Sequence, residues 1–263
     1  MQAYWYLVRM KVQVGLAYRF EVFAVMATQM IVMVASVYLW NNAFTGQSSL
    51  AGLDRSQMVT YAVLAVVLSS LFQNGVQNAI SRGVREGSIA VHFLRPADIV
   101  AMFFCDDLGA MVTAFFLKTL PLLMLGALVF GISPPAGPLA LFLALFSVCF
   151  AFLILWLLSA LTGMITFWAM SLGQLGVVKD VIVNILSGML IPIWFFPPFM
   201  QTVLRYLPFQ YTYQTPIGIY IGRITVQEGL FEILVQLVWV VLLYGLVRLV
   251  WQRARGHVLV QGG

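Results

Sequence analysis

The chain has 263 residues, of which 62% are hydrophobic and only 9% are charged. A soluble domain carries about 25% charged residues, so this composition excludes a soluble fold and indicates an integral membrane protein. The net charge is +5, but the basic residues stand singly between apolar segments, which excludes a nucleic-acid-binding surface. The apolar segments are continuous rather than alternating, which predicts membrane helices and not a barrel.

The N-terminal third predicts an interfacial helix and two spans. Residues 1–20 mix aromatic and basic side chains, so we expect an amphipathic helix that lies in the membrane interface. Spans are predicted at about 21–40 and 58–80, joined by a polar loop. The second ends in amides at helical spacing, which favour interhelical hydrogen bonds or, alternatively, a substrate surface. These amides are Gln73, Asn74, Gln77 and Asn78.

The middle of the chain contains the longest charged connection, residues 81–98, and then a long apolar stretch at 99–131. Asp106 and Asp107 are expected near the aqueous boundary of this third span, and Lys118 deeper within it. A cation at mid-span costs about 3 kcal/mol. Lys118 therefore either faces a polar cavity or an acidic partner, or it has a structural role.

The second half predicts a proline-rich turn at 133–138, a fourth span at 139–168 and a short connection at 171–180. Residues 181–194 are apolar but interrupted by a glycine and a proline, and another short helix at 199–207 ends at a proline. We expect a broken helix followed by a re-entrant hairpin, about 188–209, packed inside protein. The final span is predicted at 233–250 and a basic tail at 251–263.

The chain is thus predicted to be an all-α membrane protein with one six-helix transmembrane domain, residues 21–263. Counting charges gives the orientation, because cytoplasmic loops carry an excess of Lys and Arg. With both termini in the cytoplasm, only Arg55, Arg205 and Arg223 fall outside. The basic residues on the inner side are Arg9, Lys11, Arg19, Arg82, Arg85, Arg95, Lys179, Arg248, Arg253 and Arg255. We therefore expect a multi-pass protein of a bacterial inner (plasma) membrane.

Catalytic and metal chemistry have few candidate residues. The two histidines, His92 and His257, are far apart in sequence, and we expect neither a catalytic residue nor a metal site. One alternative is a lipid-phosphate enzyme in which Asp98, Asp106 and Asp107 hold a metal ion. Another is an ATP-independent secondary transporter that uses Lys118 as a coupling charge.

Two segments carry a family resemblance. The first, 82–96, contains Gly87 and ends in Leu94-Arg95-Pro96. The second, 187–209, matches at Ser187, Gly188, Pro192, Phe196, Pro197, Leu207, Pro208 and Phe209. With these segments and the expected topology, the chain resembles the permease subunits of ABC-2-type ABC transporters. The resemblance would lead us to expect aliphatic residues directly before Leu94, but this chain has His92 and Phe93 there.

The resemblance implies that energy comes from a separate ATPase subunit, which would bind ATP and Mg²⁺. The chain itself lacks a GxxxxGK[ST] loop and would hold no cofactor. The ATPase would bind the connection 81–98, with Ile89 and Phe93 as apolar contacts. The full set of expected coupling residues is Arg82, Arg85, Glu86, Gly87, Ile89, Phe93, Leu94, Arg95 and Pro96.

The resemblance also implies an outer gate and a translocation path. The gate residues would be Gly188, Pro192, Phe196, Pro197, Pro198, Pro208 and Phe209. The candidate path residues are Gln73, Asn74 and Lys118. A second permease subunit, identical or related, and membrane lipids are the other expected partners, and an amphiphilic, lipid-like or drug-like substrate would move outward.

Overall fold

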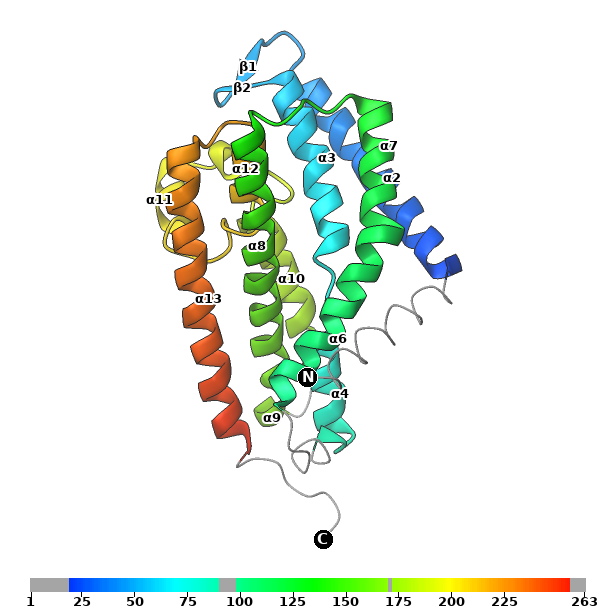
Figure 1. Ribbon diagram of the computed structural model, residues 1–263, viewed down its shortest axis with the longest axis vertical. Coiled ribbons are helices and arrows are strands. Elements are labelled where there is room, and N and C mark those ends of the chain that lie inside the picture. Colours follow the sequence, from blue (N-terminus) through cyan, green and yellow to red (C-terminus); the bar gives the residue numbers. More distant parts are fainter. Residues whose placement is uncertain (1–18, 90–97, 170–171, 256–263) are drawn as a thin grey trace.

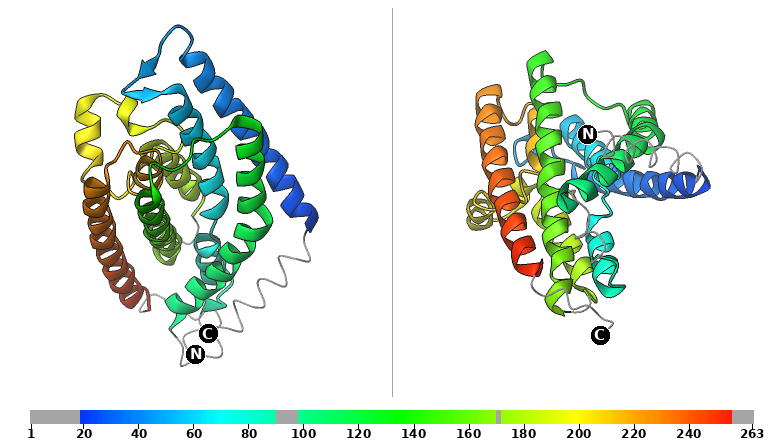
Figure 2. Two further views of the ribbon diagram at one scale, coloured as in Figure 1. Left: turned by 45° about the horizontal axis from the view of Figure 1, so that its top comes forward. Right: turned by 60° about the horizontal axis from the view of Figure 1, so that its bottom comes forward.

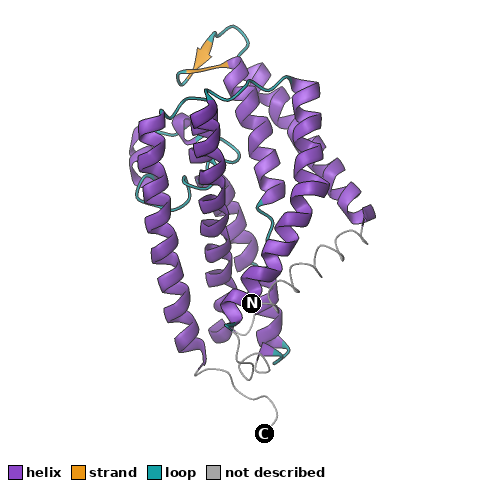
Figure 3. Ribbon diagram, in the orientation of Figure 1, coloured by secondary structure: helices purple, strands orange, loops and turns teal. Residues whose placement is uncertain are grey.

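The computed structural model describes residues 19–89, 98–169 and 172–255, and these form an elongated helical bundle (Figures 1 and 3). Nearly all of the predicted interfacial helix, residues 1–20, lies outside the described part of the chain. The all-α prediction omitted one small hairpin, β1 (Ser49–Leu50) paired antiparallel with β2 (Leu53–Asp54). Its two turn residues, Ala51 and Gly52, have φ of 51° and 76°, the left-handed pair that a tight two-residue hairpin turn requires.

Helices of very different length make up the rest of the described chain. The first half contains α2 (Arg19–Ala43), α3 (Arg55–Leu71), α4 (Val76–Arg85), α6 (Ile99–Ala114), a π-helix (Phe115–Thr119) and α7 (Leu120–Phe130). The second half contains α8 (Pro138–Met164), α9 (Thr166–Ala169), α10 (Leu175–Leu186), a 3-10 turn (Ile193–Phe195), α11 (Pro198–Leu204), α12 (Gln214–Tyr220) and α13 (Val226–Arg255).

Five helical stretches in the described residues are long and apolar enough to cross a membrane. They are Val22–Ala43, Arg55–Arg85, Ile99–Phe130, Pro138–Ala169 and Val226–Ala254, which correspond to the first four predicted spans and the last. The predicted fifth span is not a long helix, because α10 has 12 residues and ends at Leu186. At 1.5 Å per residue it is about 18 Å long, well short of a bilayer core of about 30 Å.

Helix α8 occupies the middle of the bundle, and α13, α12, α4 and α10 pack around it (Figure 2). Its inner face is buried, whereas large apolar side chains of α2, α7 and α13 point outward, as expected for helices that contact lipid. Small residues allow close approach: a Cβ added to Gly163 of α8 would lie 2.9 Å from the carbonyl oxygen of Gln77 in α4.

The third span contains a π-helical turn, which was not predicted from the sequence. Pro121 follows this turn and has no N–H to donate to the carbonyl of Leu117. Just before it, the N–H of Leu120 bonds to the carbonyl of Phe115, five residues back. The proline is therefore accommodated by a local change of winding, and the span continues to Phe130 instead of ending.

The irregular segment after α10 is held by side chains from other elements. The hydroxyl of Tyr61 in α3 donates to the carbonyl of Gly188 over 2.7 Å, and the N–H of Ile193 donates to the side-chain carbonyl of Gln214 over 2.5 Å. Backbone groups outside regular helices need such partners in the absence of water. Gly188 has φ of 83°, and a Cβ there would lie 2.8 Å from the Tyr61 hydroxyl.

We predict that Tyr61→Phe destabilises the protein, because it leaves a buried carbonyl of the irregular segment without its donor. Such a loss costs about 1–3 kcal/mol, which corresponds to a decrease in Tm of about 5 °C. The measurement is thermal unfolding of the protein in lipid nanodiscs. Tyr206→Phe is the matched control, since Tyr206 is 77% exposed. Equal melting of the two variants would contradict the role of the Tyr61 hydroxyl.

Candidate functional site

The second span is broken between α3 and α4, where the sequence predicted one continuous helix. The break covers residues 72–75, and α4 then begins at Val76. The N–H groups of Gly75 and Val76 donate to the two carboxylate oxygens of Asp107 over 2.8 and 3.0 Å. The indole N–H of Trp156 donates to the same carboxylate over 2.9 Å. Asp107 thus satisfies the free N-terminus of a half-helix inside the bundle.

From the sequence, Asp107 was expected near the aqueous boundary of the third span, and its burial inside the bundle was not anticipated. The residue is only 5% exposed, and its two side-chain oxygens accept three hydrogen bonds from α4, its N-terminal cap and α8. No local pattern in the sequence indicates this contact, because Asp107 lies 32 residues after Gly75.

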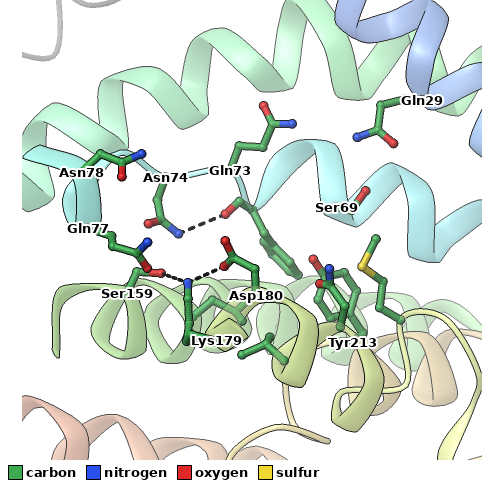
Figure 4. Close-up of a pocket in the computed structure, with 15 residues that line it drawn as sticks. Gln29, Ser69, Gln73, Asn74, Gln77, Asn78, Ser159, Lys179, Asp180 and Tyr213 are labelled. Carbon is green, nitrogen blue, oxygen red and sulfur yellow. Dashed lines mark hydrogen bonds and ion pairs between the residues drawn. The ribbon is translucent and has the colours of Figure 1, made fainter. Parts of the chain in front are cut away.

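A polar cavity of about 540 Å³ opens beside the break, between α2, α3, α4, α8 and α10 (Figure 4). Its most frequent lining groups are side-chain amides, those of Gln29, Gln73, Asn74, Gln77, Asn78 and Asn184. The four amides identified in the sequence at the end of the second span therefore all line this cavity. Gln73 and Asn74 lie in the break itself and not on a helical face, so the predicted i, i+4 stripes do not form.

A Lys–Asp pair on α10 faces the same cavity. Lys179 lies 2.6 Å from the carboxylate of Asp180 and donates to the hydroxyl of Ser159 over 3.1 Å (Figure 4). Both charges were expected from the sequence to lie in a short connection and were not considered as site residues. The detectable signal was two adjacent opposite charges directly before an apolar stretch.

A second cavity of about 390 Å³ lies on the other side of the break. Arg82, Asp106 and Asp107 contribute its charged lining, and Gln73, Asn74 and Asn78 line both cavities. The junction of α3 and α4 is therefore a partition between two polar spaces.

Lys118 lies in the π-helix, and its ammonium group donates to the side-chain carbonyl of Gln73 over 3.4 Å. Next to it, the hydroxyls of Thr119 and Ser70 are 3.0 Å apart in a buried contact between the π-helix and α3. The three predicted path residues are thus brought together: Gln73 and Asn74 line the cavities, and Lys118 contacts them through Gln73.

The three aspartates do not form a metal site. Among the described residues, no group of three or more His, Cys, Asp or Glu side chains is arranged to hold a metal ion. Asp98 instead caps the start of α6 and forms an ion pair with Arg248 of α13. Partial burial opposes ionisation, but the hydrogen bond and charge of Arg248, with two backbone N–H donors, hold the pKa of Asp98 below its ordinary value.

The predicted coupling residues lie at the far end of α4. Arg82, Arg85 and Glu86 are at least partly exposed there, and Gly87 ends the helical turn with φ of 69°. Ile89 was expected to be an exposed apolar contact for a partner, but it is 2% exposed and packs into the core beside Gly83, so that expectation is wrong. Phe93, Leu94, Arg95 and Pro96 lie outside the described residues.

The predicted gate residues differ in how far their side chains are buried. Gly188, Pro192 and Pro208 are buried, Phe196 and Phe209 are half-buried, and Pro197 and Pro198 are exposed at the start of α11. The segment lies at the end of the bundle opposite the tip of α4 (Figure 1).

A sequence model for a family described as "ABC-2 family transporter protein" matches residues 30–257, which include every cavity-lining residue except Gln29. No curated protein and no solved structure matches the chain.

We predict that Asp107→Asn destabilises the bundle strongly, because an amide N–H₂ would face donors where the carboxylate now accepts them. We expect a loss of about 2–3 kcal/mol, measured by thermal unfolding in nanodiscs. Trp156→Phe, which removes one donor of three, should have a smaller effect. Glu86→Gln is the control, an exposed carboxylate beyond the other end of α4. If Asp107→Asn melts like Glu86→Gln, Asp107 does not hold the break.

Proposed function

Because the chain belongs to the ABC-2 family of transporter proteins, we propose that it is the permease subunit of an ATP-driven exporter. The observation that carries this proposal is the construction of α4. One end of this 10-residue helix lines the polar cavity with Gln77 and Asn78, and the other end carries Arg82 and Arg85 at its surface. A rigid helix that connects a docking surface to a cavity converts a push at one end into a change of shape at the other.

The proposed docking surface is the connection 81–98, which would receive a separate ABC ATPase. The two ends of this connection are attached to different parts of the bundle. Its start continues from α4, and its last residue, Asp98, is paired with Arg248 of α13. Movement of the docked ATPase would therefore act on the second, third and last spans together. ATP and Mg²⁺ would bind to the ATPase, and this chain would hold no cofactor.

We propose six membrane crossings with both termini in the cytoplasm. The five long helical stretches, the second of which is interrupted at residues 72–75, would supply five crossings. The remaining crossing would be α10 with residues 187–197, a broken and partly non-helical segment. The distribution of charge supports this orientation: α4 and α13 end in Arg85 and Arg255 at one end of the bundle, whereas Arg55, Arg205 and Arg223 lie at the other (Figure 1). We place the first end in the cytoplasm, in a bacterial inner membrane.

The re-entrant segment, residues 188–209, would form the outer gate. It is the most irregular described part of the bundle and lies at the proposed outer side, with α11 as its short helix. Its anchors to Tyr61 of α3 and Gln214 of α12 would hold one side of the gate to the second span, which lines the cavity, and to the short helix that precedes the last span. A second permease subunit, identical or related, would complete the path along which an amphiphile moves outward.

We predict that Arg85→Glu with Arg95→Glu abolishes binding of the ATPase, because reversal of two charges repels a surface that now attracts it. The measurement is recovery of the ATPase when the tagged chain is purified from the membrane. Arg205→Glu is the matched control, an exposed arginine at the opposite end of the bundle. Unchanged recovery of the ATPase with the double variant would refute the assignment of residues 81–98.

A further inference from the structure

The larger cavity is lined by groups that both donate and accept hydrogen bonds. Each of its six amides offers an N–H₂ donor pair and a carbonyl acceptor, and the hydroxyls of Ser69, Ser159 and Tyr213 both donate and accept. Some of these groups already have partners in the protein: Asn74 donates to the carbonyl of Phe72 over 3.3 Å, and Ser69 donates to the carbonyl of Val66 over 2.7 Å. Gln73 accepts from Lys118 over 3.4 Å, and Ser159 accepts from Lys179 over 3.1 Å. These bonds use only part of the donors and acceptors in the wall. The wall therefore keeps capacity for a ligand that both donates and accepts.

The charges that line this cavity cancel. Among the described lining residues the ionised groups are Lys179 and Asp180, and they pair with each other at 2.6 Å. A site for a cation uses an acidic group or an aromatic face aimed at the ligand, and a site for an anion uses an arginine or lysine that is available to it. The anion pattern is not met, because the one lysine is engaged by an aspartate and a serine. The cavity does contain two aromatic rings, Phe72 and Tyr213, but they pack edge to face against each other with their centroids 5.3 Å apart, and the one acidic group, Asp180, is paired with Lys179.

The side chain of Gln77 shows how tightly one amide in this wall is packed. Its side-chain carbonyl oxygen is buried and has no hydrogen-bond partner among the described residues, whereas buried polar atoms are almost always paired. The other end of the same amide is packed against α10, since a Cβ added to Gly176 would lie 2.2 Å from its nitrogen. The amide is therefore held in place by packing, and its oxygen, which no water-sized molecule can reach, is not a contact for a molecule in the cavity.

The surroundings also suit an attached apolar chain. Val183 and Met189 line the cavity beside the polar groups, and the neighbouring outer face of α10 exposes Val181, Ile182 and Ile185 at 51%, 43% and 42%. A molecule with its head in the cavity would thus have an apolar helix face along which its chain can lie.

We propose that this cavity binds the head group of an amphiphile, and that this head group is uncharged and rich in hydroxyl groups, as in a sugar. The assignment rests on the proposed permease function and narrows its substrate class: a neutral glycolipid-like molecule, in preference to a lipophilic cation or an anionic lipid. A volume of about 540 Å³ is in the range of small-molecule sites.

The first test compares head groups on one tail. The full chain in nanodiscs, without nucleotide, is equilibrated with radiolabelled dodecyl maltoside below its micellar concentration, with empty nanodiscs as background. Unlabelled dodecyl maltoside should displace the label about tenfold more effectively than dodecyltrimethylammonium or dodecyl phosphate, because only the sugar pairs with the amides. Equal or better displacement by the cation or the phosphate overturns the proposal.

The second test changes the cavity. Gln77→Leu with Asn184→Leu should weaken binding of the maltoside about tenfold, whereas Gln252→Leu, an exposed amide on the last turns of α13, should leave it unchanged. A separate variant, Asp180→Asn, gives a result that does not depend on whether the double variant folds. It frees Lys179, so binding of dodecyl phosphate should tighten about tenfold. No gain for the phosphate, or no loss for the maltoside in a folded double variant, overturns the assignment.

Failure of this proposal and failure of the permease function give different results. Head-group binding is measured without the ATPase, whereas the permease function is tested by recovery of the ATPase on residues 81–98. A chain that recovers its ATPase but shows no preference for the maltoside is a permease for another substrate class. A chain that prefers the maltoside but recovers no ATPase has the binding site without the proposed coupling.

Discussion

The fold depends on how the bundle supplies hydrogen-bond partners to backbone groups that a broken helix leaves unpaired inside the membrane. A helix that stops in a bilayer leaves N–H groups without water to accept them, and each unsatisfied group costs several kcal/mol. Asp107 provides the solution at the most consequential position, where its two oxygens accept the N–H groups of Gly75 and Val76 at the start of α4. With this support the second span can be divided, and the division makes room for the polar cavities on its two sides.

The same requirement explains which contacts accompany the break. Once α4 is a separate helix, its position is set by its neighbours and not by α3. Gly163 of α8 and Gly176 of α10 let the Gln77 region approach without a Cβ in the way. A short helix fixed at its N-terminus by a carboxylate and along its length by close packing moves as one body, and this property gives the proposed link between the cavity and the proposed docking surface a physical basis.

The sequence predicted the features that depend on composition and failed where distant residues meet. Continuous apolar runs located the long helices correctly, and the prolines around residues 192–208 marked the irregular segment. The break at residues 72–75 was missed because its partner, Asp107, belongs to another span. Gln73 and Asn74 were identified by their polarity in an apolar context, whereas the charges near the start of α10 were assigned to a loop. Ile89 shows the opposite error, since an apolar residue in a charged segment was expected to face a partner and is buried in the chain's own core.

The π-helical turn at Phe115–Thr119 has a geometric consequence for the whole third span. Such a turn takes in one residue more than an α-helical turn, so it displaces the angular positions of all later residues by about 100° relative to an uninterrupted helix. Residues of α6 and α7 that a single helical wheel would draw on one side therefore point in different directions. A helical wheel for α7 therefore has to start at Leu120. A one-residue deletion within the π-helical turn would rotate α7 relative to the lipid and would shorten the span by only about 1.5 Å.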